Sequence, residues 1–224
     1  MTDAWPTFLV IYEDSPEDMG LLTCILLHNG CRWDEHRRYE DLRLDIDLDR
    51  YRGVVSLGGK GKRKDYNEME WLRRAVDYEN ISVLGICQGA QNVAQVLSRK
   101  KLRKARPCDQ GLIPLHLSDA GKGDMVLGCL PEGQRLCQWH DYTYVLPDNA
   151  DCLAYSGSNP CDRPEAFRLY GRVYAMQFHP EVPCTEIAKW IRNGERKPSR
   201  AECVQIAQTG WNILDAWVKM AISL

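Results

Sequence analysis

A short apolar strand, SVLGI (82–86), turns directly into a helix over 88–100, and this arrangement constrains the fold more than any other stretch of the chain. A short apolar run bounded by a turn is typical of a strand buried on both faces. Gly85 and Gly89 flank Cys87 at the turn, where glycine permits a cramped backbone and a close passage of strand and helix. Cys87 therefore has two possible explanations: it is a small residue that packs well in a tight turn, or it is a nucleophile that the turn exposes to a substrate.

Strands and helices alternate over the first hundred residues. We expect strands at 8–14, 35–40, 51–59 and 82–86, and helices at 16–30, 67–80 and 88–100. Such alternation is typical of a parallel sheet with helices on both faces. The middle of the chain changes to short extended segments, and 166–182 predicts a strand–turn–strand unit around Tyr170-Gly171. The pattern contains no internal repeat and no convincing domain boundary.

The last segment, 199–224, has apolar residues at helical spacing. The expected apolar stripe consists of Val204, Ala207, Trp211, Leu214, Val218 and Ala221. Its simplest interpretation is a helix packed on the body of the protein. A partner-binding face is the alternative, because exposed tryptophans are costly without a partner.

The composition excludes several classes of protein. The 224 residues suffice for one sizeable core, and the net charge of −2 disfavours nucleic acid or a membrane as the main partner. No apolar run approaches the roughly 18 residues that span a bilayer, and the N-terminus lacks a signal-peptide pattern. The ten cysteines are scattered without a Cys-x-x-Cys pair, so we expect reduced thiols in a cytoplasmic protein. No His/Cys grouping has zinc-ligand spacing, and we expect neither a metal nor a cofactor.

A Gly-x-Cys-x-Gly turn at the start of a helix is suited to a nucleophile. The helix dipole and its unpaired N–H groups stabilise a thiolate there, and the next backbone N–H can hold an oxyanion. A cysteine nucleophile also needs a base, and QFHPE (177–181) offers His179 with Glu181 two residues later. On an extended segment these side chains point the same way, so the carboxylate can orient the imidazole. The candidate catalytic residues are Cys87, His179 and Glu181.

These motifs carry a family resemblance. GICQGAQ (85–91) with MQFHPEV (176–182) resembles the class I glutamine amidotransferases, especially stand-alone members similar to the glutaminase domain of guanosine monophosphate synthetase. VVSLGG (54–59) matches their glycine loop, and 137–156 matches the segment that they write as Trp-His-Gly-Asp before a Leu-Pro turn. The resemblance implies a flavodoxin-like three-layer α/β fold. It also implies a catalytic domain at residues 1–195 and a C-terminal amphipathic helix at 196–224 that packs on the same domain.

The resemblance implies a reaction as well. The Cys87 thiolate attacks the side-chain amide of glutamine or of a related γ-glutamyl amide, while His179 relays the proton and Glu181 orients His179. Water then hydrolyses the γ-glutamyl thioester. The oxyanion is expected on the N–H of Gln88 and on an N–H of the Gly58-Gly59 loop.

Further substrate contacts are implied by the same likeness. Gln91 matches a glutamine that contacts the bound substrate in relatives, and an ordinary helix-surface residue is its alternative reading. His140 and Asp141 lie in the segment that, in the family, faces the α-amino and α-carboxyl groups of the substrate.

The sequence departs from the family at four places. Gln88 stands where an apolar or aromatic residue is usual, and the glycine loop continues into a basic run at 60–64 instead of a proline. Asp141 replaces the glycine of Trp-His-Gly-Asp, and Pro164-Glu165 replaces Asn-Gln. All four lie near substrate or partner surfaces, whereas the triad is intact. We therefore expect a working catalyst with an unusual substrate.

Three functions are compatible with these residues. The first is an amidotransferase subunit that releases ammonia for a separate synthetase, because the chain has no Gly-x-x-x-x-Gly-Lys-[Ser/Thr] motif of its own. The second is a self-sufficient γ-glutamyl hydrolase with a leaving group larger than ammonia, which the changes at Gln88 and Asp141 favour. The third, a non-catalytic binding module, is disfavoured by the intact triad.

Overall fold

The computed structural model describes residues 5–13, 19–38, 46–59, 66–78, 80–160, 162–191 and 195–224. Its centre is an eight-stranded sheet with the order β2-β1-β3-β4-β10-β9-β8-β6. These strands are β1 (Thr7–Tyr12), β2 (Arg32–Arg37), β3 (Gly53–Ser56), β4 (Ser82–Ile86), β6 (His116–Leu117), β8 (Asp151–Tyr155), β9 (Pro164–Leu169) and β10 (Val173–Met176). The strands from β2 to β10 run parallel, and β9, β8 and β6 continue the sheet antiparallel.

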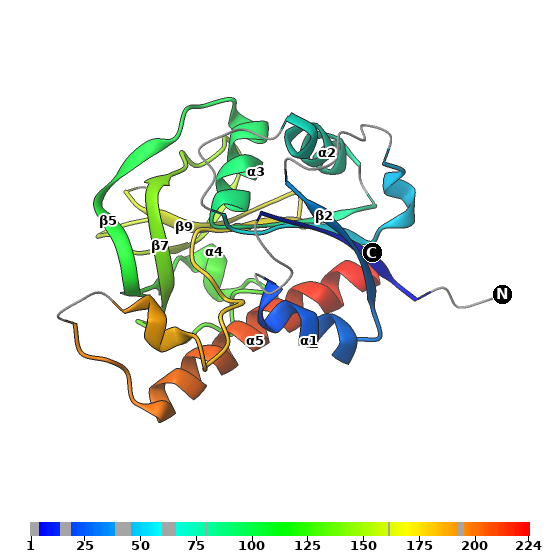
Figure 1. The fold of residues 1–224 in the computed structure, drawn as a ribbon. Coiled ribbons are helices and arrows are strands. Elements are labelled where there is room, and N and C mark those ends of the chain that lie inside the picture. The colour runs from blue at the N-terminus through cyan, green and yellow to red at the C-terminus, as the bar shows by residue number, and fades with distance from the viewer. Residues whose placement is uncertain are drawn as a thin grey trace.

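Helices cover both faces of this sheet, as Figure 1 shows. On one face lie α2 (Tyr66–Asp77) and α3 (Gln88–Ser98), and on the other lie α1 (Leu21–His28) and α5 (Arg200–Ser223). The apolar core is correspondingly split into one buried cluster on each side of the sheet. The parallel strand order β2-β1-β3-β4-β10 is that of flavodoxin-like proteins. The predicted three-layer α/β fold is therefore confirmed.

A second, two-stranded sheet stands beside the main one. It pairs β5 (Arg103–Pro114) antiparallel with β7 (Arg135–Thr143). β7 contacts the segment that follows β10 in the main sheet. There the backbone amide of His179 donates to the carbonyl oxygen of Cys137 at 2.8 Å. The remaining elements are short: η2 (Leu48–Arg50), α4 (Asp119–Lys122) and η3 (Ile187–Trp190).

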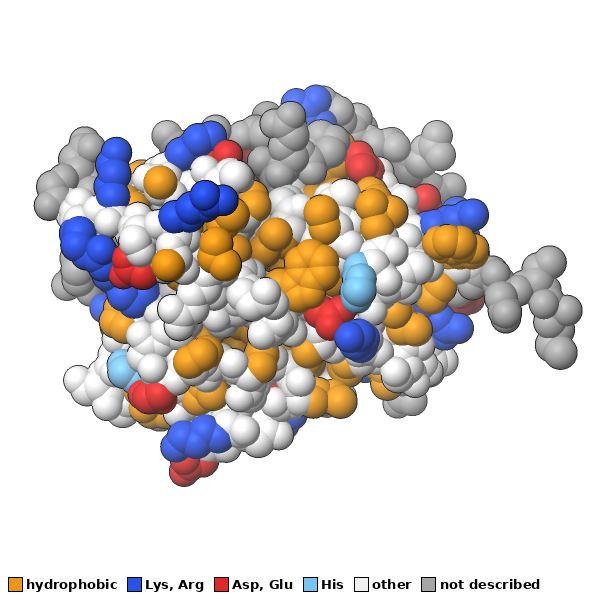
Figure 2. All heavy atoms as spheres, turned by 90° about the horizontal axis from the view of Figure 1, so that it is seen from below, with side chains coloured by type: hydrophobic (Ala, Val, Ile, Leu, Met, Phe, Trp, Pro, Cys, Tyr) orange, Lys and Arg blue, Asp and Glu red, His pale blue; other side chains and the backbone are white. Residues whose placement is uncertain are grey.

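The C-terminal helix is correct in place, but its buried face was only partly predicted. Leu214, Val218 and Ala221 of the expected stripe are buried, whereas Val204 is 51% exposed. The structure buries the neighbouring face as well, including Trp217, whose ring centroid lies 5.8 Å from that of Phe8 in β1. The reason is that α5 contacts both its neighbour α1 and the sheet, so its C-terminal half is covered on two sides. Figure 2 shows hydrophobic side chains gathered in the middle of this lower face.

Two element boundaries differ from the prediction. The strand expected at 35–40 is β2 at Arg32–Arg37, because it pairs in register with the full length of β1, from Thr7↔Arg32 to Tyr12↔Arg37. The helix expected at 16–30 is α1 at Leu21–His28, and residues 14–18 lie outside the described part of the chain. Among the described helices, none is both long and apolar enough to cross a membrane.

Candidate active site

Cys87 lies on a tight turn between β4 and α3. Its backbone has φ 53° and ψ −107°, in the left-handed half of the map where a side chain is strained, and it forms the N-cap of α3. A Cβ on Gly85 would lie 2.6 Å from the backbone of Gly89, and a Cβ on Gly89 would overlap the carbonyl of Ser56 in β3. Both glycines are therefore required by close backbone approach. The turn places the thiol at the positive end of a helix.

His179 and Glu181 form a buried pair three and five residues beyond the end of β10. Nδ1 of His179 lies 2.6 Å from Oε1 of Glu181, and both side chains are less than a tenth exposed. Burial disfavours the imidazolium, but the negative charges of Glu181 and Cys87 outweigh burial and raise the pKa of His179 to about 10. Nε2 of His179 is buried and has no hydrogen-bond partner among the described residues. The imidazole is thus held at Nδ1 by Glu181, and its Nε2 is available for proton transfer.

The glycine loop, residues 57–59, lies against the side chains of both Cys87 and His179. A Cβ on Gly58 would be 3.0 Å from Cε1 of His179 and 3.5 Å from Cβ of Cys87. Gly89 at the start of α3 donates its N–H to the carbonyl of Leu57 at 3.2 Å, so the loop and the helix are joined directly. The loop therefore brings its backbone groups close to the side chains of Cys87 and His179.

Two tryptophans border the site and were not singled out by the sequence analysis. The ring of Trp190 in η3 packs on the imidazole of His179, with centroids 4.5 Å apart, and Trp139 meets Trp190 edge-on at 6.5 Å. The carbonyl oxygen of Trp139 lies 4.0 Å from Sγ of Cys87, while its side chain is 47% exposed. An aromatic wall, Trp139 and Trp190, thus runs from the imidazole of His179 to the surface.

Of the remaining residues that were expected to contact the substrate, some are buried and others are exposed. Gln91 is buried and donates from Nε2 to the carbonyl of Tyr142 at 2.7 Å, so its alternative reading as a helix-surface residue is wrong. His140 is buried, with Nε2 2.7 Å from Oε1 of Gln138. Asp141 is exposed on β7. The basic run at 60–64 lies outside the described residues.

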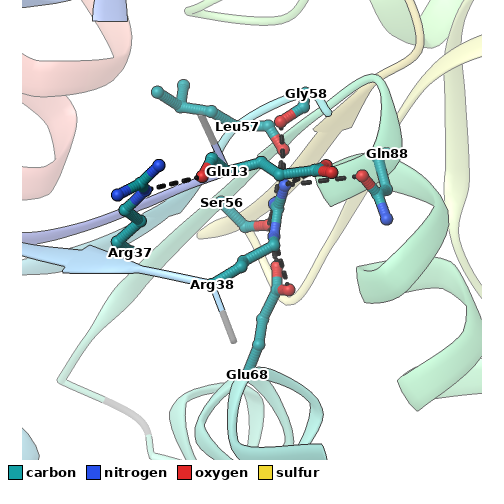
Figure 3. Close-up of polar contacts among 8 residues, drawn as sticks. All are labelled: Glu13, Arg37, Arg38, Ser56, Leu57, Gly58, Glu68 and Gln88. Atoms are coloured by element: carbon teal, nitrogen blue, oxygen red, sulfur yellow. Dashed lines mark hydrogen bonds and ion pairs between the residues drawn. The ribbon is translucent and has the colours of Figure 1, made fainter. Parts of the chain in front are cut away.

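Sequence reasoning also missed a polar network behind the glycine loop, drawn in Figure 3. Arg38, which follows β2, reaches under the loop and pairs with Glu68 of α2 at 2.7 Å. Oε1 of Gln88 accepts from Nη1 of Arg38 at 3.4 Å, so this unusual residue joins the same network. Arg38 gave no local signal, because an arginine at a strand end is ordinarily a surface residue.

Comparison with known proteins identifies the family. The sequence profile described as "Glutamine amidotransferase class-I" matches residues 22–196. The chain belongs to the class I glutamine amidotransferases. The glutamine amidotransferase structure from Thermotoga maritima has a TM-score of 0.82 at 20% sequence identity, covering 99% of this chain and 100% of that one. At this identity the structural likeness concerns the fold alone.

Curated relatives of this chain carry two kinds of name. A glutamine-hydrolyzing GMP synthase subunit of Thermoplasma acidophilum is 26% identical over 186 residues, which are 76% of this chain and 90% of that protein. Gamma-glutamyl peptidase 5 of Arabidopsis thaliana is 29% identical over 163 residues, which are 68% of this chain and 63% of that protein. The GMP synthase of Gloeothece citriformis is 27% identical over 131 residues, which are 58% of this chain and 23% of that protein. The match thus spans less than a quarter of that longer relative.

Proposed function

We propose that the chain hydrolyses the γ-glutamyl amide bond of glutamine or of a related γ-glutamyl amide through a thioester on Cys87. The observation that carries the proposal is the meeting of three groups: a cysteine at the N-terminus of α3, the His179–Glu181 pair at 2.6 Å, and the glycine loop in contact with both. Nucleophile, oriented base and candidate oxyanion donors are the parts that acyl transfer requires.

In this mechanism Sγ of Cys87 attacks the γ-carbonyl carbon of the substrate, and the carbonyl oxygen becomes an oxyanion. The N–H of Gln88 and an N–H of the Gly58-Gly59 loop hold this oxyanion. The C–N bond breaks as His179, whose raised pKa keeps it protonated at neutral pH, gives its proton to the departing amine. His179 then takes a proton from water, whose oxygen attacks the thioester and releases glutamate and the thiolate.

One version of this function supplies ammonia to a synthetase. The support is the name of the relatives, since the GMP synthase subunit of Thermoplasma acidophilum matches over most of both chains. A separate synthetase partner would then bind near the mouth of the site. In this version glutamine is the substrate and the partner raises the rate.

A second version is a self-sufficient hydrolase of γ-glutamyl amides or peptides with a larger leaving group. The aromatic wall supports it, because the leaving amine must lie beside His179 to receive its proton, and Trp190 packs on that imidazole. An exposed tryptophan, Trp139, extends the wall to solvent and offers apolar contact to a substituent. The name of the Arabidopsis relative, gamma-glutamyl peptidase 5, agrees with this version.

A substrate panel separates the two. Purified protein is offered glutamine, γ-glutamyl alkylamides, γ-glutamyl anilides and γ-glutamyl peptides, and kcat/KM is compared, with Cys87→Ala as the inactive control. A clear preference for bulky amides supports the second version and contradicts the first. Glutamine hydrolysis that is weak for the protein alone and rises when a co-purifying synthetase is added supports the first version and contradicts the second. Turnover that persists in Cys87→Ala would overturn the proposed nucleophile.

A further inference from the structure

We propose that Arg38 is a positioning residue that fixes the peptide planes of the glycine loop, so that its N–H groups face the oxyanion formed on Cys87. The proposal rests on the function proposed above. It concerns a residue remote from the substrate, since the Arg38 side chain is fully buried and cannot touch a ligand.

Arg38 is held in place by a buried carboxylate. Its Nε lies 2.7 Å from Oε2 of Glu68, its Nη2 lies 3.0 Å from Oε1, and the Glu68 side chain is 1% exposed. Ser56 at the end of β3 donates to the same carboxylate at 2.5 Å and lies 3.1 Å from Nη2 of Arg38. Desolvating such a pair is costly, and an apolar pair of similar size is often at least as stable. Stability alone therefore gives little reason to have a charged pair here.

The two terminal nitrogens of the guanidinium also reach the glycine loop (Figure 3). Nη2 donates to the carbonyl of Leu57 at 2.6 Å, and Nη1 donates to the carbonyl of Gly58 at 2.8 Å. Because a trans peptide unit is planar, its N–H points opposite to its C=O. Two consecutive carbonyls held by Arg38 therefore direct the N–H groups of Gly58 and Gly59 away from the guanidinium. Among the described residues, neither N–H has a hydrogen-bond acceptor.

The catalytic residues lie against the same loop. Gly58 approaches Cys87 and His179 so closely that a Cβ would be 3.5 Å and 3.0 Å from their atoms. A Cβ on Gly59 would overlap a Glu13 carboxylate oxygen and lie 2.8 Å from Nη1 of Arg38, so Gly59 is confined too. The loop thus lies between a rigid cation and the reacting groups. Glycines lack the side chains that would otherwise resist a flip of the peptide plane, and Arg38 supplies that resistance.

The same contact couples the two expected oxyanion donors. The carbonyl of Leu57 accepts from Arg38 and also from the N–H of Gly89, in the first turn of α3. Gln88, whose N–H is the other expected donor, turns its side-chain oxygen to Arg38 at 3.4 Å. Arg38 therefore helps to position both sets of expected oxyanion donors, the N–H groups of the glycine loop and the N–H of Gln88. The Gln88 side chain contributes to this positioning through its contact with Arg38.

The test replaces the ion pair with apolar residues of similar length, Arg38→Met with Glu68→Met, to avoid leaving one buried charge unpaired. The matched control is Arg172→Met. Arg172 is also a buried arginine that donates to three carbonyls, those of Ala75, Val76 and Ile81, but at the far end of α2. Each variant is assayed for kcat and KM with the best substrate of the panel, for the rate at which iodoacetamide alkylates Cys87, and for its thermal midpoint.

The double variant should lose about 10²-fold in kcat, as expected for loss of an oxyanion donor, with KM changed by less than about threefold. Alkylation of Cys87 forms no oxyanion, so its rate should stay at the wild-type value. Arg172→Met should keep its kcat even where its thermal midpoint falls. A folded double variant with wild-type kcat overturns the proposal, and so does an equal loss of kcat and alkylation, which would indicate general disruption of the site.

Two further measurements keep the outcome decisive. If the double variant does not fold, Arg38→Lys replaces it, because lysine keeps the charge but cannot fork to two carbonyls, and a kcat like the wild type's would contradict the proposal. A crystal structure of the folded variant should show at least one of the two loop peptides rotated, and an unchanged loop refutes the positional claim. This readout needs no turnover, so wild-type protein that cleaves no γ-glutamyl amide refutes the proposed function only.

Discussion

Nδ1 of His179 donates to Oε1 of Glu181 at 2.6 Å, and both side chains are largely shielded from water. The two residues stand at i and i+2 on an extended segment, with Pro180 between them. That spacing places both groups on one side of the chain, and the segment is fixed in turn by the His179 amide, which bonds to Cys137 of β7. The orientation of the His179 imidazole therefore depends both on Glu181 and on the pairing of the His179 backbone with β7.

Glu181→Gln should lower kcat by about 10²-fold, because the amide cannot stabilise the imidazolium that protonates the leaving amine. KM should change little, since Glu181 does not touch the substrate. Steady-state kinetics with the best amide measures both. The surface variant Glu186→Gln serves as the control, and a Glu181→Gln enzyme with unaltered kcat would contradict the role of the pair.

The stability of the protein should depend on pH through His179. The charges of Glu181 and Cys87 raise the pKa of His179 from 6.5 to about 10 in the folded protein. The imidazolium therefore contributes stability that is fully present below about pH 6.5 and is lost as the pH rises towards 10. The difference in free energy of unfolding between the wild type and His179→Gln should shrink over this range. A difference that stays constant from pH 6 to pH 10 would contradict the raised pKa.

Trp139→Ala should separate the two leaving-group hypotheses at one residue. If the aromatic wall binds the amine substituent, the variant loses roughly tenfold in kcat/KM for an anilide, about 1.4 kcal/mol, and far less for glutamine. Tyr170→Ala is a fitting control, because Tyr170 is also exposed but lies on the turn between β9 and β10. Equal losses for both substrates would show that Trp139 does not select the leaving group.

Trp217→Ala should destabilise the protein by about 3–5 kcal/mol, because it removes a fully buried ring packed on Phe8. Val204→Ser, on the exposed side of the same helix, should change the free energy of unfolding by less than about 0.5 kcal/mol. Denaturant titration of both variants tests which face of α5 is buried. The reverse order of the two effects would contradict the packing of α5 against β1.

The sequence predicted best what is encoded locally. The strand–turn–helix at Cys87 and the spacing of His179 and Glu181 each lie within a few residues, so their patterns predicted the local geometry that the structure has. The parallel sheet followed from alternating strands and helices. The buried face of α5 was harder, because apolar residues such as Val204 and Trp217 lie on several sides of the helix, and only the packed sheet and α1 decide among them.

Contacts between distant residues could not be predicted in this way. Arg38 and Glu68 are thirty residues apart and meet only because the residue after β2 and the first turn of α2 both reach Ser56 at the end of β3. Trp190 belongs to a short η3 turn with little periodicity, yet it packs on the imidazole of His179. The sequence marks Gln88 as unusual for the family, but it contains no signal that the partner of its side chain is Arg38.

The most direct test of the central claim is to observe the acyl-enzyme. The protein is mixed with the best γ-glutamyl amide, quenched in acid within the first turnovers and analysed by intact-protein and peptide mass spectrometry. The account predicts one γ-glutamyl group on the peptide that contains Cys87, and none in Cys87→Ala. Turnover of the substrate with no adduct on Cys87, or an adduct on another of the ten cysteines, would contradict it.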